Sequence, residues 1–215
     1  MLGADVRRDE AWARVTAMSM RLSRADAWSL LTEWVTSESL RRHCLAVEAS
    51  MRAYARAGGH DEELWGVVGL LHDMDYERFP DLGTGHPRMA IAELESRDAD
   101  PILVRAIASH ADFMGVSRDS DLEQTLFAVD ELSGFVLACS YVRPEGIHGL
   151  TAKSVKKKLK QPSFAAAVNR DDVANGAAGL GVDFDQHVQV VIGALEPLAE
   201  ELGIAGRAAQ PAADT

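Results

Sequence analysis

Apolar residues recur at helical spacing along nearly the whole chain. In the segment 38–57 they alternate in steps of four and three, which places them on one face of an α-helix: Leu40, Cys44, Val47, Met51 and Tyr54. In the segment 62–71 they lie on all sides, as is typical of a central buried helix. No segment shows the apolar–polar alternation of a β-strand, so the sequence predicts an all-α protein.

Capping residues and helix breakers divide this pattern into further helices. Helix starts are expected at Ser23, Thr36 or Ser37, Asp61, Pro87, Asp100–Pro101 and the capping box of Ser120 and Glu123. Towards the C-terminus we expect a lysine-rich helix (TAKSVKKKLKQ), a short helical stretch at 163–178 and a last helix from Phe184 to Leu202. The loop from Met74 to His86 is long for a compact domain, so we expect it to be functional or mobile.

Length and composition indicate one globular domain. We place it at 1–205, with C-terminal helices at 150–203 and a disordered tail at 206–215. There is no run of about 18 apolar residues that could cross a membrane, and the N-terminus lacks the apolar core of a signal peptide. With only two cysteines, a reducing cytoplasm is the expected compartment. The net charge of -11 disfavours binding to nucleic acid or an anionic membrane.

Several histidines and acids face the predicted core. His43 lies on the apolar face of segment 38–57, and His110 follows Ile107 at helical spacing. His72 and Asp73 directly follow the buried segment 62–71, and Asp130 shares a face with apolar residues, where an ionised carboxylate is costly unless paired. Each alone fits an ordinary hydrogen-bonded core residue. Together they provide the nitrogen and oxygen ligands that Zn, Fe or Mn prefer.

The order His43, His72–Asp73, Asp130 on successive helices resembles the HD-domain superfamily of metal-dependent phosphohydrolases. The segments "GHPRMAIAEL" and "VRAIASHAD" add His86 and His110, as in the two-metal, HDIG-like branch. The resemblance covers about residues 37–142 and implies an HD-domain helical bundle.

It further implies that one divalent ion is held by His43, His72, Asp73 and Asp130. A second would be held by His86 and His110, with Asp73 as the bridging and catalytic residue. A histidine directly before Pro87 also fits a simple helix cap. His60, His148 and His187 match nothing in the family pattern, and we interpret them as surface or structural residues.

The resemblance implies that a metal-bridging hydroxide attacks a phosphate ester of a nucleotide or small metabolite. Fe, Mn, Zn, Co and Ni are not distinguished by such ligands. Many two-metal members carry a phosphate-binding lysine three residues after the aspartate, where this chain has Tyr76, and we expect Asp75, Tyr76, Glu77 and Arg78 to line the mouth of the site. The lysine-rich helix places Lys153, Lys156 and Lys157 on one face, so these are candidate substrate-binding residues, with Arg143 and Arg170 as weaker ones.

Two other functions fit the same ligands. One is a diiron oxygenase, because some similar proteins hold two irons and use dioxygen to cleave a C–C or C–P bond. The other is a regulatory protein with a purely structural metal, although such a closed site needs only about four ligands. We expect the protein to bind a small phosphorylated substrate. A homodimer is a further possible assembly. We expect no binding to a membrane or to nucleic acid.

Overall fold

The computed structural model describes residues 21–206. Within this range the protein contains α-helices and short 3-10 helices but no β-strand, which confirms the predicted all-α class. The elements are α2 (Arg24–Trp34), α3 (Glu38–Gly58), α4 (Glu62–Leu71), α5 (Arg88–Ser96), α6 (Pro101–Ser109), η1 (Asp112–Met114), α7 (Asp121–Tyr141), α8 (Ala152–Leu159), α9 (Arg170–Gly179), α10 (Phe184–Leu195) and η2 (Glu196–Leu198). No helix in this range is long and apolar enough to cross a membrane.

The predicted caps begin most of these helices. Side-chain oxygens accept hydrogen bonds from first-turn backbone N–H groups at Ser23, Ser37, Asp61, Asp100 and Ser120. Ser120 and Glu123 form the expected reciprocal capping box. Helix α5 begins one residue after Pro87, which serves as its N-cap residue without a side-chain hydrogen bond.

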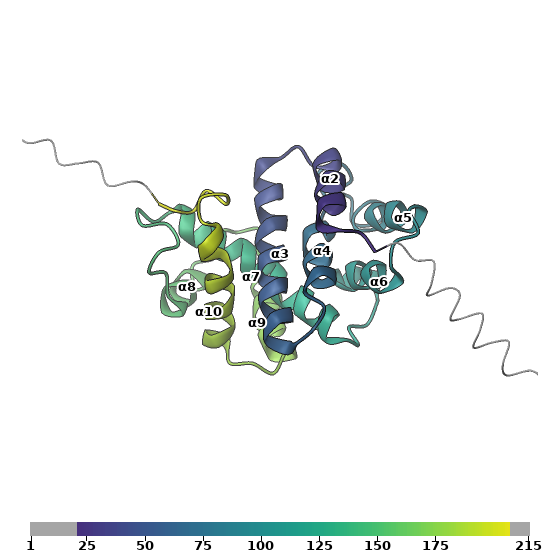
Figure 1. Cartoon of the computed structure of the whole chain (residues 1–215). Coiled ribbons are helices and arrows are strands. Elements are labelled where there is room, and N and C mark those ends of the chain that lie inside the picture. Colours follow the sequence, from purple (N-terminus) through teal and green to yellow (C-terminus); the bar gives the residue numbers. More distant parts are fainter. Residues whose placement is uncertain (1–20, 207–215) are drawn as a thin grey trace, which may run out of the picture.

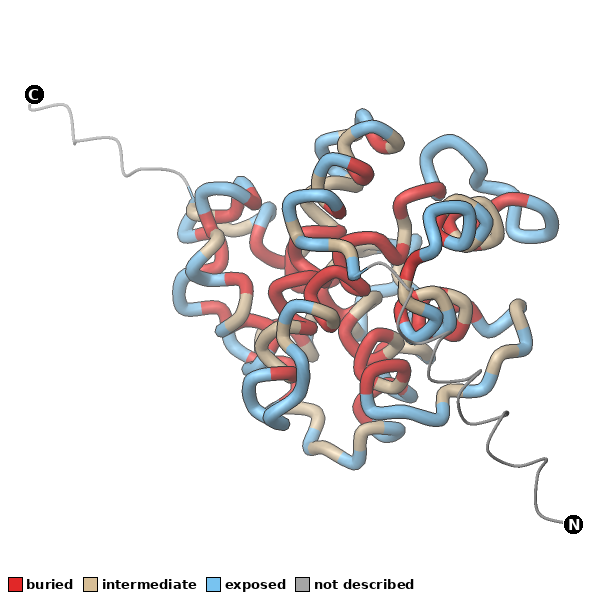
Figure 2. The backbone as a smooth tube through the Cα atoms, turned by 45° about the vertical axis from the view of Figure 1, so that its right-hand side comes forward, coloured by how far each residue is buried: buried red, intermediate tan, exposed pale blue. Residues whose placement is uncertain are grey.

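Helix α3 runs through the middle of the molecule (Figure 1). It packs against α4, α7 and α10, while α5 and α6 lie on the far side of α4, and α8 lies beside α10. Buried residues concentrate where these helices meet, and exposed residues cover the outside (Figure 2). The helices that carry the candidate ligands therefore adjoin a single core.

Helix α4 is buried on nearly all sides, as its sequence predicts. It can lie very close to α3 because Gly69 has no side chain. A Cβ atom at Gly69 would lie 2.9 Å from Met51 Cγ and 3.0 Å from the backbone of α3. This close contact fixes the C-terminal end of α4, where His72 and Asp73 follow.

The C-terminal part differs from the prediction in two places. The last helix ends at Leu195 instead of Leu202, because Pro197 has no N–H to continue the helical hydrogen bonds. The stretch predicted as helical from residue 163 becomes helical only at Arg170, where Asn169 caps α9, and the preceding residues form turns. The tail predicted to be disordered lies outside the described residues from position 207 onward.

Candidate metal centre

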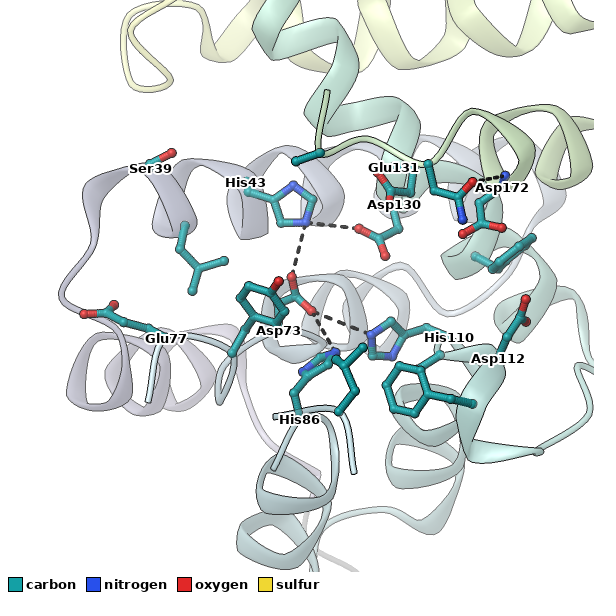
Figure 3. A pocket seen from close by; sticks show the side chains of 18 of the residues that line it. Ser39, His43, Asp73, Glu77, His86, His110, Asp112, Asp130, Glu131 and Asp172 are labelled. Atoms are coloured by element: carbon teal, nitrogen blue, oxygen red, sulfur yellow. Dashed lines mark hydrogen bonds and ion pairs between the residues drawn. The ribbon is translucent and has the colours of Figure 1, made fainter. Parts of the chain in front are cut away.

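The six side chains predicted as metal ligands converge at the centre of the domain. His43 lies on α3 and Asp130 on α7, His72 and His110 follow the last residues of α4 and α6, and Asp73 and His86 lie in the turns after α4 and before α5. Figure 3 shows Asp73 between His43 on one side and His86 and His110 on the other. Residues separated by up to 87 positions along the chain therefore meet at one place.

Three of the histidines are oriented by hydrogen bonds from Nδ1. His72 Nδ1 donates to the Gly69 carbonyl oxygen at 2.8 Å, and His110 Nδ1 donates to that of Ile107 at 2.6 Å. His86 Nδ1 donates to Asp75 Oδ1 at 2.8 Å. Because the acceptors carry no proton, each Nδ1 holds a proton, and each Nε2 is the ring atom directed towards the site, where it can bind a metal ion once it is deprotonated.

The two carboxylate oxygens of Asp73 face different pairs of histidines. Asp73 Oδ2 lies 3.7 Å from His43 Nε2 and 3.6 Å from His72 Nε2. Asp73 Oδ1 lies 3.5 Å from His86 Nε2 and 3.6 Å from His110 Nε2. Asp73 thus belongs to both groups of potential ligands, as a bridging carboxylate must.

Asp130 completes the group that contains His43 and His72. Its Oδ1 atom lies 3.0 Å from His43 Nε2 and 3.3 Å from His72 Nε2, and these two nitrogens are 3.2 Å apart. Ligand atoms about 2.1 Å from a shared ion, at angles of about 90–110°, lie roughly 3.0–3.4 Å from one another. The donor set and its spacing therefore fit a divalent ion in this group.

The electrostatics of the site favour positive charge. Burial alone lowers the pKa of His72, but the Asp73 and Asp130 carboxylates outweigh it and raise that pKa to about 9. Burial would raise the pKa of Asp73 and of Asp130, yet the histidines around them hold both well below the usual range. Both carboxylates are therefore ionised at neutral pH, the state in which they bind a metal ion.

Asp75 orients His86 and is not at the mouth of the site, which corrects the prediction for this residue. Its side chain is fully buried. Oδ1 accepts from His86 Nδ1, and Oδ2 accepts from the backbone N–H of Ala90 at 2.8 Å. The same bond shows that His86 is held as a ligand would be, instead of capping α5. The burial of Asp75 gave no sequence signal, because it lies in a turn without helical periodicity.

A pocket of about 810 Å³ opens over these ligands. Side chains of His43, Asp73 and Asp130 are partly exposed to it, whereas His72 is fully buried behind them. Residues of α3 and α7 also line the pocket, and further lining comes from the turns after α4, from η1 and from the start of α9, including Tyr76, Glu77, Leu82, Asp112, Phe113, Asn169 and Asp172. The volume suits a small metabolite.

Tyr76 and Glu77 line this pocket, as predicted for the mouth of the site. The Tyr76 ring packs edge-on against His86 at a centroid distance of 5.2 Å. Arg78 does not line the pocket, which is a second correction: its guanidinium lies over the Trp34 ring, 5.5 Å from the centroid.

The structure does not bring the predicted lysines to the pocket. Lys153, Lys156 and Lys157 are not among its lining residues. They lie on α8, which packs against α10 and α7, and Lys156 pairs with Asp185 of α10 at 2.6 Å. The guanidinium groups of Arg143 and Arg170 donate to backbone carbonyl oxygens of their own loops. The amphipathic pattern correctly predicts the helix α8, but it does not predict which residues lie next to the polar face of that helix.

Two acidic residues of the pocket were missed from the sequence. Glu131 follows Asp130 on α7, and Asp172 lies in the first turn of α9. Burial, helped by the charge of Asp130, raises the pKa of Glu131 to about 7. Burial, with nearby Asp112, also raises the pKa of Asp172. No local signal could have found this pair, because it depends on the packing of α9 against α7.

The other three histidines lie outside the pocket lining, in agreement with their predicted structural or surface roles. His187 is fully buried and bonds to Tyr54 and to the Ala128 carbonyl. His60 stacks on Trp65, and exposed His148 pairs with Glu196.

Comparison with known families identifies the part of the chain that carries these ligands. Residues 40–134 match the HD domain family. Searches of curated proteins and of solved structures gave no match. The matched segment begins three residues before His43 and ends four residues after Asp130, so it contains all six candidate ligands. HD domains bind divalent metal ions, and members of their superfamily are generally metal-dependent hydrolases. The two-metal, HDIG-like branch stays a prediction. The matched segment, the all-α fold and the convergence of the six candidate ligands together support membership of the HD-domain superfamily for residues 40–134.

Proposed function

We propose that this protein is a metal-dependent phosphohydrolase that cleaves a phosphate ester of a nucleotide or small metabolite. The observation that carries the proposal is the position of Asp73, whose two oxygens face two separate histidine pairs below a pocket. Two bound divalent ions would supply a hydroxide nucleophile at neutral pH and offset charge on a phosphoryl oxygen.

The chain's own residues position the ions and the substrate. His43, His72 and Asp130 would hold one ion, and His86 and His110 the other, with Asp73 shared between them. The hydrogen bonds from Nδ1 of His72, His86 and His110 fix the rings before any ligand arrives, so little reorganisation is needed on binding. Tyr76, at the mouth, would contact the substrate.

Phosphate release after metal reconstitution tests the proposal. Metal-free protein would be loaded separately with Mn²⁺, Zn²⁺, Co²⁺, Ni²⁺ or, without oxygen, Fe²⁺, and assayed on nucleotides and small phosphate esters. We expect phosphate release that His110→Ala abolishes and that His148→Ala, an exposed histidine away from the pocket, retains. Lys157→Ala should also retain it, because Lys157 does not line the pocket. Phosphate release that is equal in His110→Ala would contradict the proposal.

One observation favours a second candidate, a diiron oxygenase that cleaves a C–C or C–P bond. Tyr76 replaces the phosphate-binding lysine, and within residues 21–206 no lysine or arginine lines the pocket. An oxygenase does not require such a clamp. Substrate-dependent oxygen uptake by the Fe²⁺-loaded protein, without phosphate release, would identify this activity instead.

A purely structural metal site is less consistent with the geometry. Structural ions are enclosed by their ligands, whereas catalytic ions keep a position open. Here His43, Asp73 and Asp130 all face an open pocket. This exposure supports catalysis over a regulatory protein that metal merely stabilises.

A further inference from the structure

Three large apolar side chains at the mouth of the pocket are about half exposed, which hydrolysis itself does not require. Tyr76 is 46% exposed, Leu82 48% and Phe113 45%, and all three line the pocket. Single apolar side chains are ordinary on a protein surface, but several of them gathered at one pocket are typical of a ligand-binding surface. We call Tyr76, Leu82 and Phe113 the apolar rim.

The loop that carries Leu82 is tightly folded. The backbone N–H groups of Gly85 and His86 donate to the carbonyl oxygens of Asp81 and Phe79, at 2.7 and 2.8 Å. A Cβ atom at Gly85 would collide with the Phe79 carbonyl oxygen, so the loop depends on glycine at this position. The backbone therefore presents Leu82 at the mouth of the pocket in a fixed conformation.

Arg88 joins this loop to Phe113. Its Nη1 atom donates to the Leu82 carbonyl oxygen at 2.7 Å, and its guanidinium lies over the Phe113 ring, 5.9 Å from the centroid. The rings of Phe113 and Tyr76 both pack against the His86 ring, at centroid distances of 6.5 and 5.2 Å. Contacts between separate segments thus build the apolar rim directly beside a candidate metal ligand.

The charges of the lining restrict what this rim can bind. Within residues 21–206 no lysine or arginine lines the pocket, whereas several carboxylates do. Arg88 is close to the mouth, but it is not a lining residue. A second phosphate on the substrate would therefore meet no cationic side chain in the lining to offset its charge.

We propose that the apolar rim binds the organic group of the substrate, so that the substrate is an ester of a single phosphate with an uncharged alkyl or aromatic group. This inference rests on the proposed function and names its substrate class. Figure 3 shows His86 on the side of Asp73 away from His43, so the rim borders the His86–His110 group. With the phosphoryl group at the metal centre, the adjoining organic group would cover the rim and remove apolar surface from water.

Substrates of increasing chain length test the inference. Mn²⁺-loaded protein would be assayed on n-alkyl phosphates from ethyl to hexyl, whose leaving groups differ little in reactivity. The same chains with a second phosphate at the far end would be assayed beside them. We expect kcat/KM to rise about 3- to 4-fold with each added CH₂ group, because each group buries further apolar surface. The second phosphate should abolish this gain.

Variants of the apolar rim locate the effect. Leu82→Ala and Phe113→Ala should each lower the hexyl-to-ethyl ratio of kcat/KM by about 3- to 10-fold. Ile102→Ala is the matched control, since it removes an equally exposed apolar side chain from α6, outside the pocket lining, and should keep the ratio. Unchanged metal content and thermal unfolding would show that the variants are folded.

A hexyl-to-ethyl ratio near one in the unaltered protein would overturn the inference, as would a ratio that the Leu82→Ala, Phe113→Ala double variant retains. Equal kcat/KM for the bisphosphates would also overturn it. Calorimetric binding of ethylphosphonate and hexylphosphonate separates this inference from the proposed function. Tighter binding of hexylphosphonate without phosphate release from any ester would uphold the apolar site and refute hydrolysis. Phosphate release with no effect of chain length in either assay would uphold hydrolysis and refute the apolar site.

Discussion

Two fully buried histidines, His72 and His187, show how differently this fold uses the same side chain. His187 has both ring nitrogens occupied: Nε2 donates to the Ala128 carbonyl at 3.0 Å, so Nδ1 accepts from the Tyr54 hydroxyl at 2.6 Å. Burial lowers the pKa of His187, and no carboxylate opposes that effect. His72 instead uses only Nδ1 for the backbone, and its Nε2 atom faces Asp73, Asp130 and His43.

The difference teaches that burial alone does not mark a histidine as a candidate ligand, whereas a ring nitrogen directed at carboxylates and at a second histidine does. His187 is complete without any further atom, and it joins α10 to α3 and α7. The group around His72 brings two carboxylates and several ring nitrogens together at one place. We therefore expect changes near His72 to alter metal content, and changes at His187 to alter stability alone.

The largest effect is expected for Asp73→Ala. Because this carboxylate belongs to both ligand groups, its loss should remove most bound metal and lower activity by at least about 1000-fold, the equivalent of several kcal/mol of metal-supplied stabilisation. Elemental analysis and phosphate-release assays on the same preparation would measure both quantities. Full metal content and activity in this variant would contradict the assignment of Asp73 as the residue that bridges the two ions.

The opposite pattern is expected for His187→Ala. Removing the ring leaves a cavity and an unpaired buried carbonyl at Ala128, so the free energy of unfolding should fall by about 2–4 kcal/mol. Metal content per folded chain should not change. Denaturant unfolding and elemental analysis would check this, and a loss of metal in folded protein would show that His187 is coupled to the centre.

A smaller, selective effect is expected for Asp75→Asn. A side-chain amide has one acceptor oxygen where the carboxylate has two, so it cannot accept hydrogen bonds from both His86 Nδ1 and the Ala90 N–H. His86 therefore loses its fixed orientation. Metal affinity at the His86–His110 group should fall about 10- to 100-fold, as for other partners of ligating histidines. The His43–His72 group should be unaffected. Calorimetric titration of metal-free protein would resolve the two sites, and equal weakening of both would contradict a separate role for Asp75.

The smallest effect is a pH dependence that belongs to His187. Its pKa is lower in the folded protein than the unfolded value of about 6.5, so the folded state binds fewer protons. Its contribution to stability is therefore complete above about pH 6.5 and decreases as the pH falls below that value. Unfolding of the natural protein and of His187→Gln, compared between pH 5 and 7.5, should show a stability difference that shrinks towards pH 5. A difference that grows towards pH 5 would reverse the sign and refute a neutral His187.

The sequence predicted those features of the fold that depend on local chemistry. Capping side chains such as Ser120 with Glu123 predicted helix starts, and apolar residues on all sides predicted the burial of α4. The convergence of the six candidate ligands could be predicted because each lies on an inward face or at a helix end and matches the order of a known family; their binding of metal stays a prediction. Long-range contacts could not be predicted: the approach of Asp172 to Glu131 depends on how α9 packs on α7, and the isolation of the α8 lysines depends on their neighbours in α10.

The location of bound metal tests the central claim most directly. Crystals of the Mn²⁺-loaded protein, measured near the manganese absorption edge, would give anomalous difference peaks at the ions themselves. We expect two peaks on opposite sides of Asp73, one beside His43 and His72 and the other beside His86 and His110. No peak at Asp73, or a single peak bound by only one histidine pair, would contradict a carboxylate that bridges two ions.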